Sequence, residues 1–340
     1  MNILLNGVGR IGKSILRILQ NENDLKVVAI NEINPCIENL AYSINYDSTY
    51  GRLDDKFYIE GSFIKNSKAS IEVLRYKNIF DIDFNSLNID IVIDASGVKF
   101  DIEKLKKLPI KAIFLTHPNK KADINVILGV NEEKLTKNHK IISTSSCNAT
   151  ALLPLLKLLD DKKGIEYGDI ITIHPLLNHQ KTLDSGCIGS SDRDIKCNFE
   201  FGRSATQNII PSGTTTIEAC SYVIPYINKN LISSNSLRVA TPTVGAINVT
   251  LSLKKRCSKT ELLNILNDYE KNQKFDIFLN NNEALVSSDF VAQKYTTIID
   301  NRFIDVIMDK QVKIMLWYDN EFGYASKVID IVKRYFQLYY

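Results

Sequence analysis

Residues 2–12, NILLNGVGRIG, decide the fold of this chain. The apolar residues 2–6 predict a short strand, and Gly7, Gly9 and Gly12 follow it as a GxGxxG pattern before a helical run at residues 15–20. Glycines in this context let the backbone turn tightly and approach a pyrophosphate, whose charge meets the N-terminus of the helix. The stretch therefore predicts the first strand and helix of a doubly wound dinucleotide-binding domain.

An acidic residue follows the second predicted strand. The segment LKVVAIN, residues 25–31, leads directly into Glu32, which lies about 20 positions after Gly12 as the dinucleotide-binding pattern requires. A carboxylate there accepts hydrogen bonds from the adenosine ribose, and it also repels a 2′-phosphate. The sequence therefore predicts that the cofactor is NAD rather than NADP.

Further apolar segments predict strands at residues 89–97, 111–118, 125–130 and 140–146. Strands alternating with helical or loop segments are typical of α/β proteins with a parallel sheet. Such sheets bind ligands at the carboxyl ends of their strands. Ser96 and Thr116 lie at two of these ends, so we expect both in the cofactor site.

Composition excludes several other classes of protein. The 340 residues suffice for two domains, and a net charge of +3 without a basic block gives no support for a dedicated nucleic-acid-binding role. No apolar run approaches the roughly 18 residues of a membrane span, and the N-terminus lacks a signal-peptide pattern. The six cysteines form no CxxC pair, which argues against a disulfide framework or a metal site. We therefore expect a cytoplasmic protein without membrane or metal.

One cysteine has a position that suggests chemistry. Cys147, in STSSCNATALLP (143–154), follows the last predicted strand and opens a predicted helix over residues 148–161. A free cysteine is usually a small core residue. A helix N-terminus, however, lowers the pKa of a thiol, so we expect a thiolate that forms well below the ordinary value of about 8.5. Cys147 is a candidate nucleophile on this ground.

Five motifs then occur in order along the chain: SSCNAT, TIHPLLNHQKTLD, RSATQNIIP, LRVATPTV and WYDNEFGY. Together they resemble the glyceraldehyde-3-phosphate dehydrogenase family over nearly the whole chain. The resemblance implies an NAD-binding Rossmann domain over residues 1–147 and a catalytic and oligomerisation domain over 148–314. The resemblance also implies that the domain over residues 148–314 is α+β with a mixed or antiparallel sheet. It further implies a C-terminal helix, within 315–340, that returns to the NAD-binding domain, and a homotetramer.

The resemblance also assigns roles to residues. Cys147 matches the nucleophile, and His174 matches the histidine that activates it. Asn320 matches the residue that holds the nicotinamide carboxamide, while Arg10 and Ile11 match backbone contacts to the pyrophosphate. The expected substrate and phosphate site consists of Ser146, Asn148, Thr214, Thr215 and Arg238.

The implied chemistry is covalent. A cysteine sulfur that adds to an aldehyde gives a thiohemiacetal, whose oxidation by the cofactor leaves a thioester. Phosphate or water then cleaves the thioester. The expected partners are therefore a small phosphorylated aldehyde and, if phosphate is the acceptor, inorganic phosphate.

The chain also departs from the family pattern. Asn148-Ala149-Thr150-Ala151 stands where the family has Thr-Thr-Asn-Cys, and Leu177 replaces a threonine of the phosphate site. Two of these departures resemble erythrose-4-phosphate dehydrogenase, a close relative: Thr-His-Pro at residues 116–118 and the apolar Leu177. The loop over residues 185–202 is longer than the family's loop, and we interpret Cys187 and Cys197 within it as ordinary loop cysteines.

Three hypotheses follow. The first is a phosphorylating, NAD-linked dehydrogenase of glyceraldehyde 3-phosphate. The second is a dehydrogenase of erythrose 4-phosphate or another anionic aldehyde. The third is a non-catalytic dinucleotide-binding or regulatory protein, against which the joint presence of Cys147, His174 and Asn320 argues.

Overall fold

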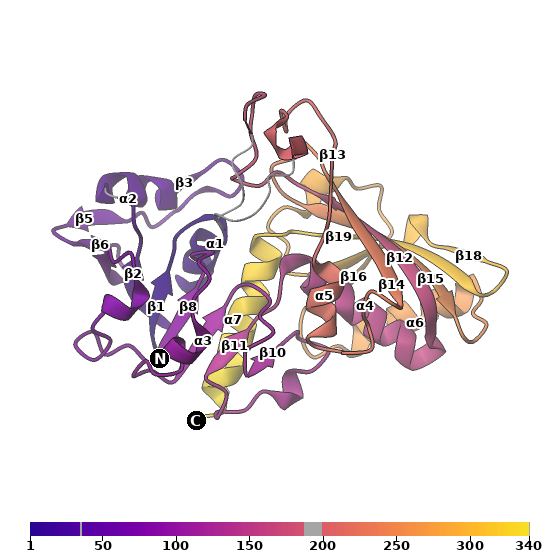
Figure 1. Ribbon diagram of the computed structural model, residues 1–340, viewed down its shortest axis with the longest axis horizontal. Coiled ribbons are helices and arrows are strands. Elements are labelled where there is room, and N and C mark those ends of the chain that lie inside the picture. Colours follow the sequence, from indigo (N-terminus) through magenta and orange to yellow (C-terminus); the bar gives the residue numbers. More distant parts are fainter. Residues whose placement is uncertain (35, 187–198, 340) are drawn as a thin grey trace. The chain divides into compact units, whose positions relative to one another are not determined.

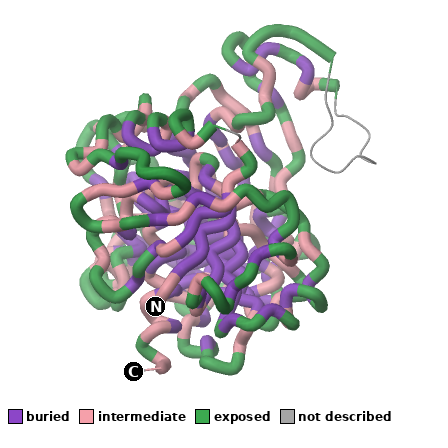
Figure 2. The backbone as a smooth tube through the Cα atoms, turned by 90° about the vertical axis from the view of Figure 1, so that its left-hand side faces the viewer, coloured by how far each residue is buried: buried purple, intermediate pink, exposed green. Residues whose placement is uncertain are grey.

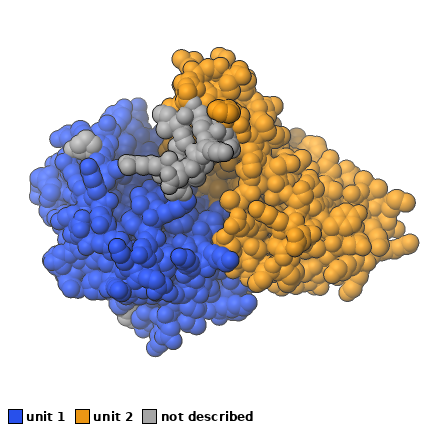
Figure 3. Space-filling model, in the orientation of Figure 1, with its two compact units in different colours: residues 1–146, 324–340 blue, residues 147–323 orange. Residues whose placement is uncertain are grey.

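The computed structural model describes residues 1–34, 36–186 and 199–339 (Figure 1). The chain divides into two units, one formed by residues 1–146 and 324–340 and the other by residues 147–323 (Figure 3). This division differs from the expected one at the C-terminal end. Residues 315–318 belong to a strand of the second unit, because β19 (Gln311–Tyr318) is paired there, and the helix α7 (Phe322–Gln337) begins only after it.

A nine-stranded sheet forms the centre of the first unit. Its strands run parallel from β10 to β7, and the two strands beyond β7 are antiparallel. From edge to edge the order is β10 (Ile124–Asn125), β11 (Ile141–Ser143), β9 (Ala112–Leu115), β8 (Ile91–Asp94), β1 (Asn2–Asn6), β2 (Lys26–Asn31), β7 (Ser70–Leu74), β6 (Phe63–Lys65) and β5 (Tyr58–Glu60). The doubly wound α/β arrangement is confirmed.

The helices of this unit are α1 (Arg10–Leu19), α2 (Ile37–Asn45), the short α3 (Ile102–Leu105) and α7. Buried strands occupy the centre of the unit (Figure 2), and residues 3–5 of β1 are fully shielded from solvent. Continuous burial of this kind explains why the parallel strands are apolar on both faces. The helix α7 joins this core through Tyr335, whose ring meets that of Phe114 edge to face at 5.4 Å.

The strand predicted at residues 125–130 is wrong. Only Ile124 and Asn125 pair in β10, and the chain then turns, with Gly129 at a φ of +76°. The side chain of Asn131 supplies the hydrogen bonds that a neighbouring strand would have provided, since it accepts from the N–H of Ile127 at 3.0 Å and donates to the carbonyl of Asn125 at 2.9 Å. The apolar pattern of residues 126–128 therefore reflects the burial of these residues and not their pairing in a strand.

The second unit is built on a mixed eight-stranded sheet, as expected. The pairs β12–β14 and β16–β17 are parallel and the remaining pairs are antiparallel. The order is β13 (Ile210–Ser212), β14 (Ile232–Arg238), β12 (Ile165–His174), β15 (Gly245–Leu253), β19, β17 (Thr297–Asp300) and β16 (Phe278–Asn281), with β18 (Asp305–Ile307) added to β19. Its helices are α4 (Cys147–Lys163), α5 (Thr216–Ser221) and α6 (Lys259–Asn272).

Within the described part of the chain, every helix is too short or too polar to span a membrane.

The glycines of the first turn allow a test of the fold. A Cβ atom on Gly12 would lie 2.1 Å from the carbonyl oxygen of Gly7, whereas a Cβ on Gly9 would meet nothing within 4 Å. We expect Gly12→Ala to lower the free energy of unfolding by about 1–3 kcal/mol because the backbone must move. Gly9→Ala, the matched control, should change it by less than about 1 kcal/mol, because φ of −70° suits alanine. Urea unfolding of both variants measures this, and equal stabilities would contradict the packing described.

Candidate active site

A pocket of about 450 Å³ lies at the carboxyl ends of β1, β2 and β8 in the first unit. This is the edge at which parallel sheets bind ligands. Of the residues expected to hold the cofactor, Gly7, Gly9, Glu32 and Ser96 line it. The lining is completed by Asn6, Asn31, Ile33, Tyr76, Lys77, Ile79, Ala95, Val98 and Phe100.

The glycine turn is shaped for a close approach of an anion. Gly7 has a φ of +87°, which side chains disfavour, and a Cβ there would lie 2.5 Å from the Cα atom of Ser96. Gly9 precedes α1, which has no side-chain cap and no acidic residue in its first turn. The uncapped N–H groups and the open space at Gly9 fit a pyrophosphate, so these residues could hold a dinucleotide.

The carboxylate of Glu32 lines the pocket and also accepts two backbone hydrogen bonds. One carboxylate oxygen accepts from the N–H of Val8 at 2.8 Å, and the other accepts from the N–H of Asn34 at 3.2 Å. The carboxylate therefore anchors the glycine turn to the end of β2.

The other expected cofactor residues of this unit are placed differently. Arg10 directs its guanidinium to Asp47 at 2.5 Å and over the ring of Tyr50. Ile11 and Gly12 continue the first turn of α1, so these three residues can contribute backbone groups there. Thr116 does not line the pocket, and its hydroxyl donates to the carbonyl of Asp94 at 2.9 Å.

Sequence reasoning missed a buried polar network beneath the glycine turn. The amide of Asn31 donates to the side-chain oxygen of Asn6 at 2.7 Å, and the amide of Asn6 donates to the carboxylate of Asp94 at 2.8 Å. Ser96 donates to the same carboxylate at 2.7 Å. Burial raises the pKa of Asp94, whose side chain is 1% exposed. An acid at the end of the apolar run IDIVIDASG was the available signal.

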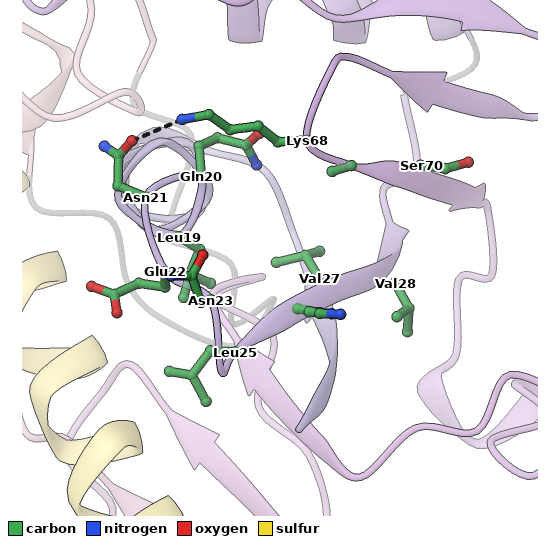
Figure 4. A pocket seen from close by; sticks show the side chains of 12 residues that line it. Leu19, Gln20, Asn21, Glu22, Asn23, Leu25, Val27, Val28, Lys68 and Ser70 are labelled. Atoms are coloured by element: carbon green, nitrogen blue, oxygen red, sulfur yellow. Dashed lines mark hydrogen bonds between the residues drawn. The ribbon is translucent and has the colours of Figure 1, made fainter.

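A larger cavity of about 550 Å³ lies at the opposite ends of the strands, beside the C-terminal end of α1 (Figure 4). Its polar groups are mainly amides and lysines, and Lys68 donates to Asn21 at 3.1 Å across its rim. Its one carboxylate, Glu22, is paired with Lys333. Because this cavity lies away from the glycine turn and from the carboxyl ends of the strands, the smaller pocket is the better candidate for a functional site.

The second unit brings Cys147 and His174 together. Cys147 begins α4 and His174 ends β12, and the Sγ–Nε2 distance is 3.8 Å. The Nδ1 atom of His174 lies 2.9 Å from the carbonyl of Pro175. A proton on Nδ1 satisfies that carbonyl and leaves Nε2 as an acceptor facing the sulfur. This is the arrangement of a nucleophile and its base.

The protonation of the pair differs from the expectation. Burial raises the pKa of the Cys147 thiol to about 11, although the N–H of Asn148 and the charge of Arg238 act in the opposite direction. Burial and Arg238 lower the pKa of His174 to about 4. The resting pair is therefore a thiol and a neutral imidazole. The expected low thiol pKa is wrong because desolvation outweighs the helix N-terminus and because His174 carries no charge.

Arg238 lies beside this pair. It ends β14 and is the register partner of His174 in β12. Its Nε and Nη1 atoms are buried and have no hydrogen-bond partner among the described residues. Buried polar groups are normally satisfied, and a guanidinium offers paired donors suited to phosphate or carboxylate. Arg238 is therefore placed to receive an anion near Cys147.

Asn148 connects several of the expected substrate residues. Its Oδ1 atom accepts from the hydroxyl of Tyr318 at 2.6 Å and lies 3.5 Å from the Cys147 sulfur, while its Nδ2 atom donates to Thr216 at 3.2 Å. The hydroxyls of Thr216 and Thr214 are 2.6 Å apart. Tyr318 and Thr216 were missed as site residues, although both stand inside or beside the quoted motifs.

The remaining predicted residues are more peripheral. Thr215 precedes α5, is exposed, and its side chain makes no capping hydrogen bond. Ser146 is partly buried and is the last residue of the first unit before the chain enters the second. Leu177 donates its N–H to Gln180 at 2.8 Å, and its apolar side chain adds no donor. Asn320 is buried, and its Oδ1 atom accepts from the N–H of Val244 and from the hydroxyl of Thr243, each at 3.1 Å. Its NH₂ group is what it can offer to a ligand.

Within residues 1–34, 36–186 and 199–339, no group of three histidine, cysteine or acidic side chains could hold a metal ion. The cysteines described there are free, with Cys36 exposed, Cys147 partly buried, and Cys220 and Cys257 buried. Cys187, Cys197 and most of the 185–202 loop lie outside the described residues.

The pKa of the thiol generates a prediction about alkylation. Because the sulfur is protonated below a pKa of about 11, the rate of Cys147 modification by iodoacetamide should keep rising between pH 8 and 10, roughly tenfold per pH unit. The exposed Cys36, alkylated in the same samples, serves as the internal reference for reagent reactivity at each pH. His174→Asn should change the Cys147 rate little, since the imidazole is uncharged.

Peptide mass spectrometry after timed alkylation measures both cysteines in one sample. A Cys147 rate that is already maximal at pH 7, and that collapses in His174→Asn, would show a thiolate–imidazolium pair and refute the neutral pair described above.

Comparisons with known proteins agree with this geometry. Residues 1–102 match the family model "Glyceraldehyde 3-phosphate dehydrogenase, NAD binding domain", and residues 146–320 match "Glyceraldehyde 3-phosphate dehydrogenase, C-terminal domain". The first of these matches supports NAD as the cofactor.

Similar proteins named glyceraldehyde-3-phosphate dehydrogenase occur in yeasts and bacteria. The protein of Debaryomyces hansenii is 36% identical over 98% of both chains, and that of Ogataea parapolymorpha is 34% identical over 98% of this chain and 97% of its own. Glyceraldehyde-3-phosphate dehydrogenase 2 of Bacillus subtilis is 32% identical over 98% of this chain and 96% of its own. The matched ranges include Cys147, His174 and the residues of the nucleotide pocket, and the chain belongs to the glyceraldehyde-3-phosphate dehydrogenase family as an NAD-dependent dehydrogenase.

Proposed function

We propose that this enzyme oxidises glyceraldehyde 3-phosphate with NAD through a thioester on Cys147, which inorganic phosphate then cleaves. The observation that carries the proposal is the buried guanidinium of Arg238, whose Nε and Nη1 atoms have no partner among the described residues and which lies in register with His174. An aldehyde with an anionic group would satisfy that charge while its carbonyl meets the sulfur.

The chain's own residues suffice for the proton transfers. Nε2 of His174 takes the proton of Cys147 as the sulfur adds to the aldehyde carbon, and the carbonyl oxygen becomes an alkoxide. His174 then gives this proton to the alkoxide, which becomes the hydroxyl of a thiohemiacetal. Because the pKa of His174 is lowered to about 4, its imidazole is unprotonated at physiological pH and Nε2 has a lone pair for the thiol proton. His174 next accepts the hydroxyl proton as the thiohemiacetal becomes a thioester. Attack of phosphate on the thioester breaks the carbon–sulfur bond and returns the proton to Cys147.

Bound NAD supplies the hydride acceptor for this chemistry. The residues of the nucleotide pocket that would hold it are Gly7, Gly9, Glu32 and Ser96. The backbone of the first turn of α1 would face its pyrophosphate. The family resemblance assigns the nicotinamide carboxamide to Asn320, whose NH₂ group has no partner among the described residues and stays available as a donor within its own unit.

The rival substrates are less well supported. Leu177 motivated erythrose 4-phosphate as an alternative, but the similar proteins over the full chain carry the glyceraldehyde-3-phosphate dehydrogenase name. The non-catalytic alternative is not favoured either, since Cys147 and His174 face each other at 3.8 Å.

Two further features of the proposal rest on the resemblance and the composition. We propose a homotetramer because the motif order matches the family throughout the chain. We propose a cytoplasmic location because the cysteines form no CxxC pair and those described are free. Light scattering of the purified enzyme tests the first, and imaging of the tagged protein in cells tests the second.

Formation of NADH tests the substrate and the acceptor together. We expect the highest kcat/KM with glyceraldehyde 3-phosphate in the presence of inorganic phosphate, and a single burst without phosphate because the thioester then accumulates. His174→Asn should lower turnover by roughly two to four orders of magnitude, the scale of a lost acid–base group. Cys147→Ser, the control, should abolish turnover while NAD still binds.

Two outcomes would overturn this assignment. Equal steady-state rates with and without phosphate would make water the acceptor, and a higher kcat/KM for erythrose 4-phosphate would restore the second hypothesis.

Glu32 generates a separate prediction about the cofactor. The carboxylate anchors Val8 and also presents charge to the pocket, and these roles can be separated. Glu32→Gln keeps an oxygen for the N–H of Val8 and removes the charge, so NAD affinity should fall little while NADP binding improves. Glu32→Ala removes both and should weaken NAD strongly. Fluorescence titration with both cofactors measures this; an unchanged preference in Glu32→Gln would show that the charge does not discriminate.

A further inference from the structure

The hydroxyl groups near Cys147 form a chain whose hydrogen-bond direction can be derived. Tyr318, Asn148 and Thr216 are buried, with exposed fractions of 1%, 9% and 2%. Thr214, which is only half-buried, ends the chain. These four residues come from β19, α4, α5 and the segment before α5. All belong to the second unit.

The first link fixes the orientation of the Asn148 amide. The hydroxyl of Tyr318 has one acceptor among the described residues, the Oδ1 atom of Asn148 at 2.6 Å. A reversed amide would place an NH₂ group there and leave the buried O–H of Tyr318 without an acceptor, which is costly. The Nδ2 atom of Asn148 therefore donates to Thr216, at 3.2 Å.

The next link follows from the inventory of a hydroxyl, which has one donor and two acceptor sites. Thr216 receives the amide of Asn148, and its own proton has no acceptor in the described chain other than Thr214, at 2.6 Å. Thr214 also accepts the backbone N–H of Thr216 at 3.2 Å. Both acceptor sites of the Thr214 hydroxyl are thus filled, and its proton is directed away from Thr216.

We propose that Asn148 is a positioning residue that sets the Thr214 hydroxyl as a donor toward a phosphate oxygen in the substrate site. The ligand chemistry is a phosphate dianion, supplied either by inorganic phosphate or by the phosphate ester of the aldehyde. The proposal rests on the proposed function only in naming that ligand. Asn148 acts through Thr216 and does not itself touch the phosphate.

Reversal of the chain is the sharpest test. In Asn148→Asp the side chain can only accept, so Thr216 donates to it, Thr214 donates to Thr216, and an oxygen lone pair of Thr214 faces the phosphate. We expect the KM for one of the two phosphates to rise by roughly 10- to 100-fold, the scale of a hydrogen bond to a charged group, with a smaller change in kcat. Varying inorganic phosphate at saturating aldehyde, and then the reverse, identifies which phosphate is held.

A second pair of variants removes the charge of the new carboxylate from the argument. Thr216→Val interrupts the chain without adding charge and should raise the same KM, while Thr216→Ser keeps the hydroxyl and should restore the wild-type value. A KM that is raised equally in Thr216→Val and Thr216→Ser would mean that packing, and not hydrogen-bond direction, is responsible, and would overturn the proposal. Wild-type constants for both phosphates in Asn148→Asp and Thr216→Val would overturn it equally.

Direct binding separates this proposal from the proposed function. Isothermal titration of the intact enzyme with inorganic phosphate, and with a non-reactive phosphate monoester, reports affinity without turnover. If neither aldehyde is oxidised but Asn148→Asp and Thr216→Val bind phosphate more weakly than wild type and Thr216→Ser, the proposed function fails and the positioning role stands. Equal affinities in all four proteins refute the positioning role whatever the enzyme oxidises.

Discussion

Exclusion of water from the ends of β12 and β14 is the constraint that sets the properties of Cys147, His174 and Arg238. It raises the pKa of Cys147, lowers the pKa of His174 and leaves the guanidinium of Arg238 with unsatisfied donors. These three consequences are linked, because the charge of Arg238 disfavours protonation of His174 and favours ionisation of Cys147. The thiol and the imidazole are therefore both uncharged beside a charged guanidinium. An uncharged imidazole has a nitrogen lone pair that can accept a proton, which is what the proposed role of His174 requires.

In the first unit, buried polar side chains support the glycine turn of the nucleotide pocket. Its glycine turn must leave backbone N–H groups open for an anion, so the turn cannot be stabilised by a capping side chain at Gly9. Support comes from below, where Asn31, Asn6 and Asp94 join the ends of β2, β1 and β8 through buried hydrogen bonds. Glu32 adds a bond to Val8 from the side. The turn is therefore held from the strand ends and by Glu32, while the first N–H groups of α1 receive no side-chain cap.

The sequence predicted those parts that follow from local pattern. The strand, glycine turn and helix of residues 2–19, and the strand that carries His174, have hydrophobic periodicity and turn residues that admit few alternatives. An apolar pattern does not show whether buried residues pair as a strand. The strand predicted at residues 125–130 is therefore wrong beyond Asn125, where the N–H of Ile127 donates to the side chain of Asn131 instead of to a neighbouring strand. The thiol pKa was also missed, because desolvation depends on which elements cover Cys147. Tyr318 and Asp94 contribute through contacts between segments far apart in the chain, and spacing alone does not reveal such contacts.

The direction of donation along the hydrogen-bond chain from Tyr318 to Thr214 is set by the amide of Asn148 and not by the hydroxyl groups. A hydroxyl rotates and can exchange its donor and acceptor roles with its neighbour, so a chain made only of hydroxyls has two directions of similar energy. An amide carries its donor and its acceptor on different atoms, and Asn148 is held in one orientation by Tyr318. The family resemblance places threonine at this position, whereas the present chain has asparagine. Asparagine at this position gives the hydrogen-bond chain a fixed direction, and its Oδ1 atom lies 3.5 Å from the partly buried sulfur of Cys147. Direction, rather than an additional contact, is therefore what this departure from the family pattern contributes to the site.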